Sequence, residues 1–391
     1  MKIKFDNIYK CSLLLNIMIL FLIRPGYILH TKIRIIFDIG LYITEIVIWF
    51  LLIFSRNNSL KNIIPFFIYC GVIIFSTFVN EGNMMECIKQ LVPLLTACVL
   101  FQLWCEKSPV TLMKSRFIFE VVTYINLMTI IVFPRGLYTG ADYSSNWFLG
   151  FNNIHIRTIL PGLALSYMYT YYKNNRIDIR TICFSIATVL TVLLVQSSTS
   201  EVGVIIFLML FFIFKKFNYK KVLKNFNLYV FSAIILILNI LILMQSKINF
   251  IAYFVEHILH KDMTFTGRDF IWNNAIDCIQ QKILLGYGFL TENEFIQLLR
   301  YKLASHPHNL LLYIMMMGGF VLLIVFGYII IKSAYKLSKC KSDLSYIVLS
   351  VICAFLFMGI AESLVGTKMF LPMFVLAINI NKFEEGKETT T

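Results

Sequence analysis

Residues 310–331 read LLLYIMMMGGFVLLIVFGYIII, a stretch that is apolar throughout and carries no charge. A helix needs about 20 predominantly apolar residues to cross the hydrocarbon core of a bilayer. Runs of this kind recur from the N-terminal region almost to Ile380. The pattern predicts an all-α, polytopic membrane protein.

We expect about twelve membrane-spanning helices. Their approximate ranges are 10–29, 33–55, 62–80, 88–105, 117–134, 154–172, 180–197, 202–214, 227–245, 308–331, 344–360 and 367–381. The composition excludes an ordinary soluble domain, because 59% of the 391 residues are hydrophobic and only 14% are charged. A transmembrane barrel is excluded as well, since its strands would alternate apolar and polar residues, whereas these runs are apolar on every face.

The distribution of Lys and Arg predicts the orientation, because cytoplasmic loops are enriched in these residues. Alternate loops collect basic residues, with the largest clusters at 215–224 and 332–341. We therefore expect both termini in the cytoplasm. The net charge of +14 needs no nucleic acid to explain it, because basic loops next to anionic lipid produce the same excess.

We expect one integral-membrane domain over residues 1–391, with a disordered cytoplasmic tail at 382–391. One extracytoplasmic loop, residues 246–307 between spans nine and ten, is long enough to be functional. Its 251–259 segment is apolar enough to lie on the membrane. Thr266 predicts an N-cap for a helix at 267–281, a second helix is expected at 292–303, and Pro307 suits the first turn of the next span.

Chemistry-bearing residues gather at the end of this loop. Arg268 and Trp272 share a face of its first predicted helix, and His306, His308 and Asn309 precede the next span. A cation and an imidazole beside the membrane indicate chemistry on an anionic lipid, in which a phosphate is held and a proton moves.

These residues also carry a family resemblance. Arg268, Trp272 and Ala275, then Gly286-x-Gly288, His308-Asn309-x-x-Leu312 and Gly318-Gly319 resemble the C-terminal signature of the O-antigen ligase and O-antigen polymerase family. A second block agrees with capsular polysaccharide polymerases of this family: Trp147-Phe148-Leu149-Gly150, Asn152-Asn153, Ile156-Arg157-Thr158 and Leu160-Pro161-Gly162.

The resemblance implies a membrane glycosyltransferase of the C type that inverts the anomeric centre at the outer face of the cell membrane. Its substrates would be oligosaccharides linked to undecaprenyl diphosphate, serving as donor and acceptor. Membrane lipids, chain-length regulators and flippases are candidate partners, and no nucleic acid is implied. Ligase members often carry a Ser-Arg pair at the outer end of a middle span, where this chain has Gln196 to Glu201 without arginine.

Physical chemistry suggests a role for each candidate. Arg268 and Arg157 would neutralise the departing diphosphate, because a planar guanidinium binds phosphate oxygens bidentately. His308 would take the proton of the acceptor hydroxyl. The remaining candidates for substrate binding are Arg135, Asn309, Trp272 and His306. We expect no cofactor and no metal, since the chain contains no Asp-x-Asp pair and its outward acids form no convincing set of oxygen ligands.

Structural roles remain open for the same residues. Arg268, Arg157 and Arg135 could contact lipid headgroups, His308 could cap a helix, His306 could order the loop, and Trp272 could simply pack. Asp38, Glu45 and Glu120 lie within predicted spans, where they either pair with Arg24, Arg34, Lys114 or Arg116 or serve proton-coupled transport.

The favoured function is a polymerase of lipid-linked polysaccharide repeat units. One alternative is a ligase that moves finished glycan to another acceptor. The alternative from another class is a lipid-linked oligosaccharide flippase or secondary transporter, which inverted repeats with broken helices would favour.

Overall fold

The computed structural model describes residues 6–55, 60–140, 145–216, 227–244, 268–302, 304–340, 342–364 and 367–388. These residues form helices and no β-strand; the only extended pairings are isolated bridges around residues 138–150. The all-α prediction is confirmed. The helices are α1 (Asp6–Lys10), α2 (Ser12–Ile23), α3 (Gly26–Leu29), α4 (Arg34–Phe54), α5 (Leu60–Val79), α6 (Met84–Lys107), α7 (Pro109–Lys114), α8 (Arg116–Val132), α9 (Asn152–Asn174), α10 (Ile179–Leu194), α11 (Ser198–Lys216), α13 (Leu228–Leu243), α15 (Arg268–Gln281), α16 (Glu292–Leu299), α17 (Leu310–Lys339), α18 (Asp343–Met358), α19 (Phe370–Ile378) and α20 (Ile380–Glu388).

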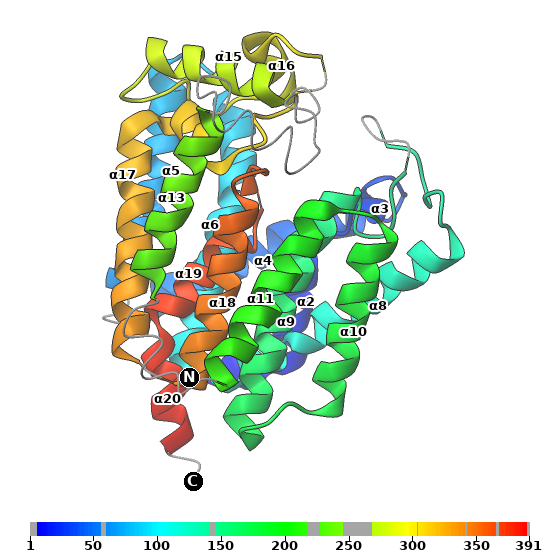
Figure 1. Ribbon diagram of the computed structural model, residues 1–391. Helices are drawn as coiled ribbons and strands as arrows, with labels where there is room; N and C mark the ends of the chain where they lie inside the picture. Colours follow the sequence, from blue (N-terminus) through cyan, green and yellow to red (C-terminus); the bar gives the residue numbers. More distant parts are fainter. Residues whose placement is uncertain are drawn as a thin grey trace.

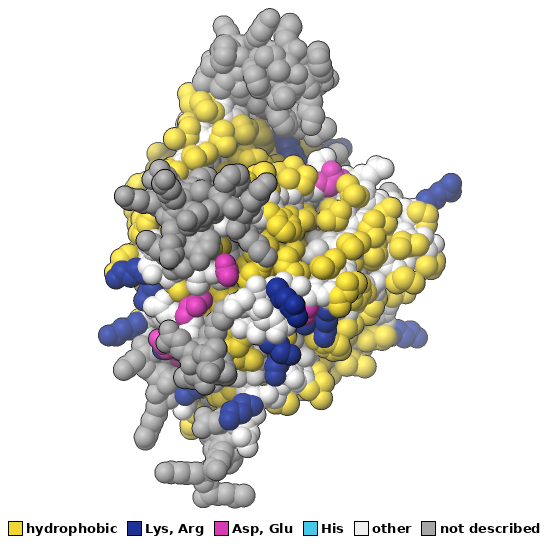
Figure 2. Space-filling view, turned by 60° about the horizontal axis from the view of Figure 1, so that its bottom comes forward, with side chains coloured by type: hydrophobic (Ala, Val, Ile, Leu, Met, Phe, Trp, Pro, Cys, Tyr) yellow, Lys and Arg dark blue, Asp and Glu magenta, His cyan; other side chains and the backbone are white. Residues whose placement is uncertain are grey.

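The long helices form a bundle, and α15 and α16 lie across one of its ends (Figure 1). Both chain termini lie towards the opposite end, where α20 projects (Figure 1). Basic residues occupy the last turns of α6, α7, α9 and α17, namely Lys107, Lys114, Lys173, Lys336 and Lys339. Figure 2, which brings the lower end of Figure 1 forward, shows Lys and Arg around that end and hydrophobic side chains over the flank.

Five helical segments in the described part of the chain are long and apolar enough to cross a membrane: Arg34–Phe54, Lys61–Val79, Met84–Lys107, Pro109–Val132 and Leu310–Lys339. Shorter apolar helices lie at 12–23, 179–194, 198–214, 228–243 and 343–358. Every predicted span overlaps a helix. The multi-pass character is supported, whereas the number of twelve crossings stays a prediction.

Burial distinguishes the centre of the bundle from its lipid-facing flank. Every residue of α19 is buried, as are nearly all residues of α18. In contrast, α4 buries Leu41, Ile48 and Leu51 but leaves a row of isoleucines exposed, namely Ile35, Ile36, Ile39, Ile43, Ile46 and Ile53. An apolar row of this size is stable against lipid rather than water.

Several predicted boundaries need correction. Helix α16 ends at Leu299, not at residue 303, because Arg300 adopts a left-handed conformation with φ 52°. Pro307 precedes α17 rather than lying in its first turn, and Asn309 is the N-cap. Residues 382–388, expected in a disordered tail, lie in α20. Thr266, Gly267 and the 251–259 segment lie outside the described residues.

Helix α17 is interrupted at Gly319, whose φ of 61° and ψ of −156° are not helical. The loop after α15 fills the interruption: Phe320 N donates to Ile283 O at 2.8 Å, and Tyr287 N donates to Met316 O at 2.7 Å. A Cβ at Gly319 would lie 2.3 Å from Leu284 O, and one at Gly286 would lie 2.5 Å from Met316 O. The two glycine motifs therefore lock α15 onto the N-terminal third of α17.

Candidate functional site

Four separate segments bring their charged side chains together at the end of the bundle beneath α15. Arg268 begins α15, and Arg157 lies in the second turn of α9. His306 and His308 lie in the loop before α17, and Glu362 follows α18. The structure thus assembles two of the three sequence-predicted arginines, Arg157 and Arg268, and both histidines around a carboxylate.

Glu362 is the centre of this cluster. Its carboxylate is 2% exposed and accepts hydrogen bonds from Arg157 NH2 at 3.1 Å and from Asn153 Nδ2 at 2.8 Å. Arg268 NH2 lies 3.8 Å from Glu362 Oε1, the oxygen that also accepts from Asn153. Two guanidinium groups thus share one carboxylate, and Arg157 Nε is buried without a hydrogen-bond partner in the described part of the chain. Donors remain available for an anion.

The loop that carries the two histidines is held from three sides. Trp272 Nε1 donates to Pro307 O at 3.1 Å. Asn309 Nδ2 donates to Asn239 Oδ1 at 2.7 Å and to Ile360 O at 3.0 Å, while Asn309 Oδ1 caps Leu312 N. Between these anchors His308 takes a left-handed conformation with φ 47°. This conformation is uncommon for a residue with a Cβ, and the contacts on either side of His308 hold it in place.

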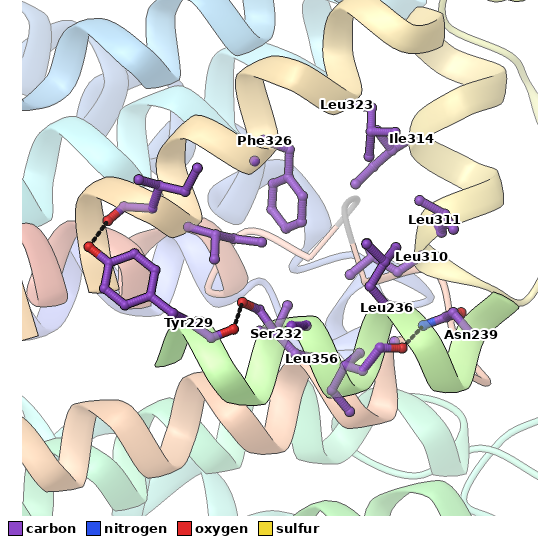
Figure 3. A pocket seen from close by; sticks show the side chains of 16 residues that line it. Tyr229, Ser232, Leu236, Asn239, Leu310, Leu311, Ile314, Leu323, Phe326 and Leu356 are labelled. Carbon is purple, nitrogen blue, oxygen red and sulfur yellow. Dashed lines mark hydrogen bonds between the residues drawn. The ribbon is translucent and has the colours of Figure 1, made fainter. Parts of the chain in front are cut away.

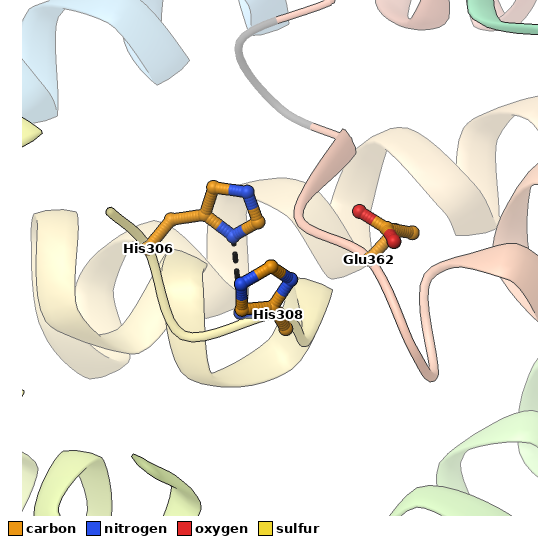
Figure 4. Close-up of side chains that lie close together, drawn as sticks. All are labelled: His306, His308 and Glu362. Carbon is orange, nitrogen blue, oxygen red and sulfur yellow. Dashed lines mark hydrogen bonds between the residues drawn. The ribbon is translucent and has the colours of Figure 1, made fainter. Parts of the chain in front are cut away.

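The two imidazoles lie against each other, with ring centroids 4.0 Å apart. His306 Nδ1 accepts from His308 N at 3.1 Å (Figure 4). His308 Nδ1 is buried and has no hydrogen-bond partner among the described residues. This atom therefore keeps an unused capacity to hydrogen-bond.

A cavity of about 400 Å³, which we call the site cavity, opens beside the cluster. Its lining includes Arg157, His306, Tyr313, Ser363, Thr291 and Glu292. The volume is in the range typical of small-molecule sites. The charged cluster therefore has a space in which a ligand can sit.

Both histidines are held in the neutral form. Burial, and then the neighbouring Arg268 and Arg157, lower the pKa of His308 to about 4. Burial, His308 and the same arginines lower the pKa of His306 well below its usual range. With neutral imidazoles, the two arginines and Glu362 give the cluster a net positive charge, which suits a negatively charged ligand.

His306, His308 and Glu362 also have metal-ligand chemistry, because one ligand atom from each lies within 4.8 Å of the others (Figure 4). Two features oppose a cation there. Glu362 is already engaged by Asn153 and Arg157, and both guanidinium groups would repel a divalent ion. The arrangement fits an anion better than a metal.

Three of the predicted substrate-binding residues lie elsewhere or are engaged. Trp272 is 3% exposed, so it positions Pro307 and offers no free face to a sugar. Asn309 is fully buried in its capping contacts. Arg135 is exposed in the turn after α8, where its carbonyl accepts from Ser145 Oγ, and it does not line the site cavity.

Sequence reasoning missed Glu362. The available signal was a single acid at the outer end of a span, next to the polar break between residues 360 and 367. The segment without arginine, Gln196 to Glu201, also reaches the cluster: Ser197 Oγ donates to Asn153 Oδ1 at 2.6 Å, and Asn153 holds Glu362. Arg157 therefore provides the positive charge that the segment from Gln196 to Glu201 lacks.

An apolar groove of about 430 Å³ between α13 and α17 leads towards the same cluster. Leu236, Ile314, Leu323 and Phe326 are among its walls, and Asn239 lies at one end (Figure 3). Asn239 Oδ1 accepts a hydrogen bond from Asn309. Asn309 directly follows His308. The groove therefore runs from the apolar interior to the neighbourhood of the histidine loop.

Comparison with known proteins agrees with the sequence motifs. Residues 183–327 match the model of a family described as O-antigen ligase. The match includes α15, the histidine loop and the first half of α17, and it confirms the resemblance found in the sequence. No curated protein matches the chain.

Proposed function

We propose that this member of the O-antigen ligase and polymerase family polymerises polysaccharide repeat units linked to undecaprenyl diphosphate. The observation that carries the proposal is the meeting of Arg157, Arg268 and two neutral histidines around Glu362, beside a cavity. We place the reaction at the outer face of the cell membrane, opposite the basic ends of α6, α9 and α17.

In the proposed reaction, an acceptor hydroxyl attacks the anomeric carbon of the donor glycan from the face opposite the diphosphate. The bond from that carbon to the diphosphate oxygen breaks, and the electron pair leaves with the diphosphate. Arg157 and Arg268 stabilise the charge that accumulates on the leaving group more than they stabilise the ground state. Arginines thus supply the positive charge, and no metal is required.

His308 accepts the proton of the attacking hydroxyl. An imidazole with a pKa of about 4 is a weak base in the empty site. The bound diphosphate would neutralise the two arginines that help to lower this pKa, so the basicity of His308 rises when the donor is present. The nearby Glu362 carboxylate would then stabilise the imidazolium.

The apolar groove between α13 and α17 would hold the isoprenoid chain of the donor. Its walls are mostly aliphatic, and its Asn239 end adjoins the histidine loop, so a chain lying in the groove would place its diphosphate at the arginines. Filling the groove with Ala233→Trp should impair transfer from a long-chain donor and spare a donor with a short prenyl chain. Equal loss with both donors would contradict this placement.

The family description favours a second candidate, a ligase that transfers finished glycan from the lipid to another acceptor. Deleting the gene and analysing the lipid-linked glycans separates the two. Accumulation of single repeat units on lipid supports the polymerase, whereas accumulation of full-length chains on lipid supports the ligase. Repeat units confined to the inner leaflet would support a flippase and contradict both.

A further inference from the structure

A second polar cavity, of about 490 Å³, lies between the outer ends of α4 and α6, and we call it the α4–α6 cavity. Its polar lining consists of Arg24, Arg34, Asp38, Tyr42, Glu45, Glu86, Lys89, Gln90 and Lys368. Glu86 and Gln90 also line the site cavity. The two cavities therefore share a wall at the beginning of α6.

Most charges of the α4–α6 cavity pair with each other. Asp38 forms ion pairs with Arg24 and Arg34, which confirms the pairing expected for this carboxylate. Lys89 pairs with Glu86 at 2.7 Å. The pairs leave a surface rich in donors and acceptors with little excess charge.

Glu45 is the exception. It is 9% exposed, and its Oε1 has no hydrogen-bond partner in the described part of the chain. Lys368 lies near enough to interact electrostatically with it, and burial lowers the pKa of the Lys368 amine to about 8. A buried carboxylate oxygen without a partner is costly. Its position in the lining of a cavity indicates that a ligand supplies the missing donor.

We infer that the α4–α6 cavity binds the acceptor saccharide. The three carboxylates in the lining offset most of the charge of its four cations, so the cavity has little net charge with which to attract a diphosphate. Sugar hydroxyls both donate and accept hydrogen bonds and so match a mixed lining. Tyr42, which is 59% exposed on the same wall, offers a ring for a sugar face. This inference rests on the proposed function, because it assigns the acceptor of that reaction.

The test uses the full-length protein in detergent, a lipid-diphosphate donor and a soluble methyl glycoside of the repeat unit as acceptor. Glu45→Gln and Lys368→Gln should each raise the KM for the soluble acceptor about 10-fold, as expected for a lost charged hydrogen bond. The donor KM should stay within about 2-fold. Tyr42→Ala, with its side chain exposed, provides a variant that should not disturb folding, and Tyr328→Ala on α17 is the matched control.

Binding of the soluble glycoside, measured by saturation-transfer NMR, separates failure of this inference from failure of the proposed function. Arg268→Ala should lose transfer and retain glycoside binding, while Glu45→Gln should lose binding. Glycoside binding without any transfer by the unaltered protein would reject the proposed function and keep the saccharide site. Unchanged acceptor KM and binding in all three cavity variants, or displacement of the glycoside from this cavity by inorganic pyrophosphate, would overturn the inference.

Discussion

Two clusters of arginine and carboxylate lie along α9, and they differ in how completely their charges are satisfied. Near the end of α9, Arg116 contacts Ser166, Thr181 and Asp178, and Arg180 pairs with Glu120. This inner cluster has two cations and two carboxylates. Near the start of α9, Arg157 and Arg268 share Glu362 alone.

This difference in charge balance favours the cluster around Glu362 as the one that binds a ligand. Arg116 also stacks on the Tyr169 ring at 4.5 Å, so its guanidinium is occupied on its face as well as its edges. This arrangement confirms the expected pairing of Glu120 and gives a structural explanation for that intramembrane acid. Among the described residues, Glu120 Oε1 also lacks a hydrogen-bond partner, but it lies 3.8 Å from Arg116 Nε. The cluster at the start of α9 keeps a positive excess, and two of its buried nitrogens, Arg157 Nε and His308 Nδ1, have no hydrogen-bond partner in the described part of the chain. The charge excess at the start of α9 therefore supports this cluster as the candidate site for an anionic ligand.

The largest effect is expected at His308. If it is the base, His308→Ala should lower the transfer rate by about 10²–10⁴ and leave donor binding nearly unchanged. Transfer by membranes matched for protein level measures the rate, and retention of labelled donor measures binding. Near-normal polymer from this variant would return His308 to a purely structural role in its loop.

Replacing one arginine in each cluster tests the comparison directly. Arg268→Ala should lose roughly 10²–10³ in rate, as for deletion of one preorganised donor, and Arg268→Lys should recover only part of it. Arg116→Ala should instead destabilise the fold by roughly 3 kcal/mol, because it removes a buried cation that pairs with Asp178 and lies beside the buried Glu120. Thermal unfolding in detergent together with turnover per folded molecule tests both, and the reverse pattern would contradict the assignment.

A smaller effect is expected on stability as the pH is lowered. At pH values between the ordinary histidine pKa of about 6.5 and the pKa of about 4 for His308, this side chain is protonated in the unfolded chain and neutral in the folded protein. Stability therefore falls as pH falls through this window, while kcat/KM for the free enzyme should hold until pH approaches 4.

Arg268→Gln removes one of the charges that lower the His308 pKa, so NMR of labelled histidine should show the pKa moving towards 6.5. Arg135→Gln, in the exposed turn after α8, is the control and should leave it unchanged. A His308 pKa that does not respond to Arg268 would mean that the two side chains are not electrostatically coupled.

The smallest expected effect is that of a chelator. Because two guanidinium groups border the His306, His308 and Glu362 set, we expect purified enzyme to retain its activity in EDTA and to gain nothing from Zn²⁺ or Mg²⁺. Activity that disappears in chelator and returns with either ion would show that the cluster holds a metal after all.

The sequence predicts the helices better than the contacts between them. Every range that hydropathy predicted as a span overlaps a helix, because apolar runs depend only on local composition. The break between α19 and α20 was not foreseen, since it depends on Asn379 meeting Gln102 from a distant helix at 2.7 Å. The sequence did not single out Glu362 for the same reason. An acid that follows a span becomes part of a site only when α9 and α15 bring arginines to it.

The interruption of α17 at Gly319 has a mechanical consequence. Hydrogen bonds from Phe320 and Tyr287 to the facing backbone hold the 283–287 loop in the gap, so α15 and the N-terminal third of α17 are joined through their backbones. Arg268 begins α15 and His308 precedes α17. The spacing between this arginine and this histidine therefore depends on backbone contacts, which a change of side chain elsewhere in the site would leave in place.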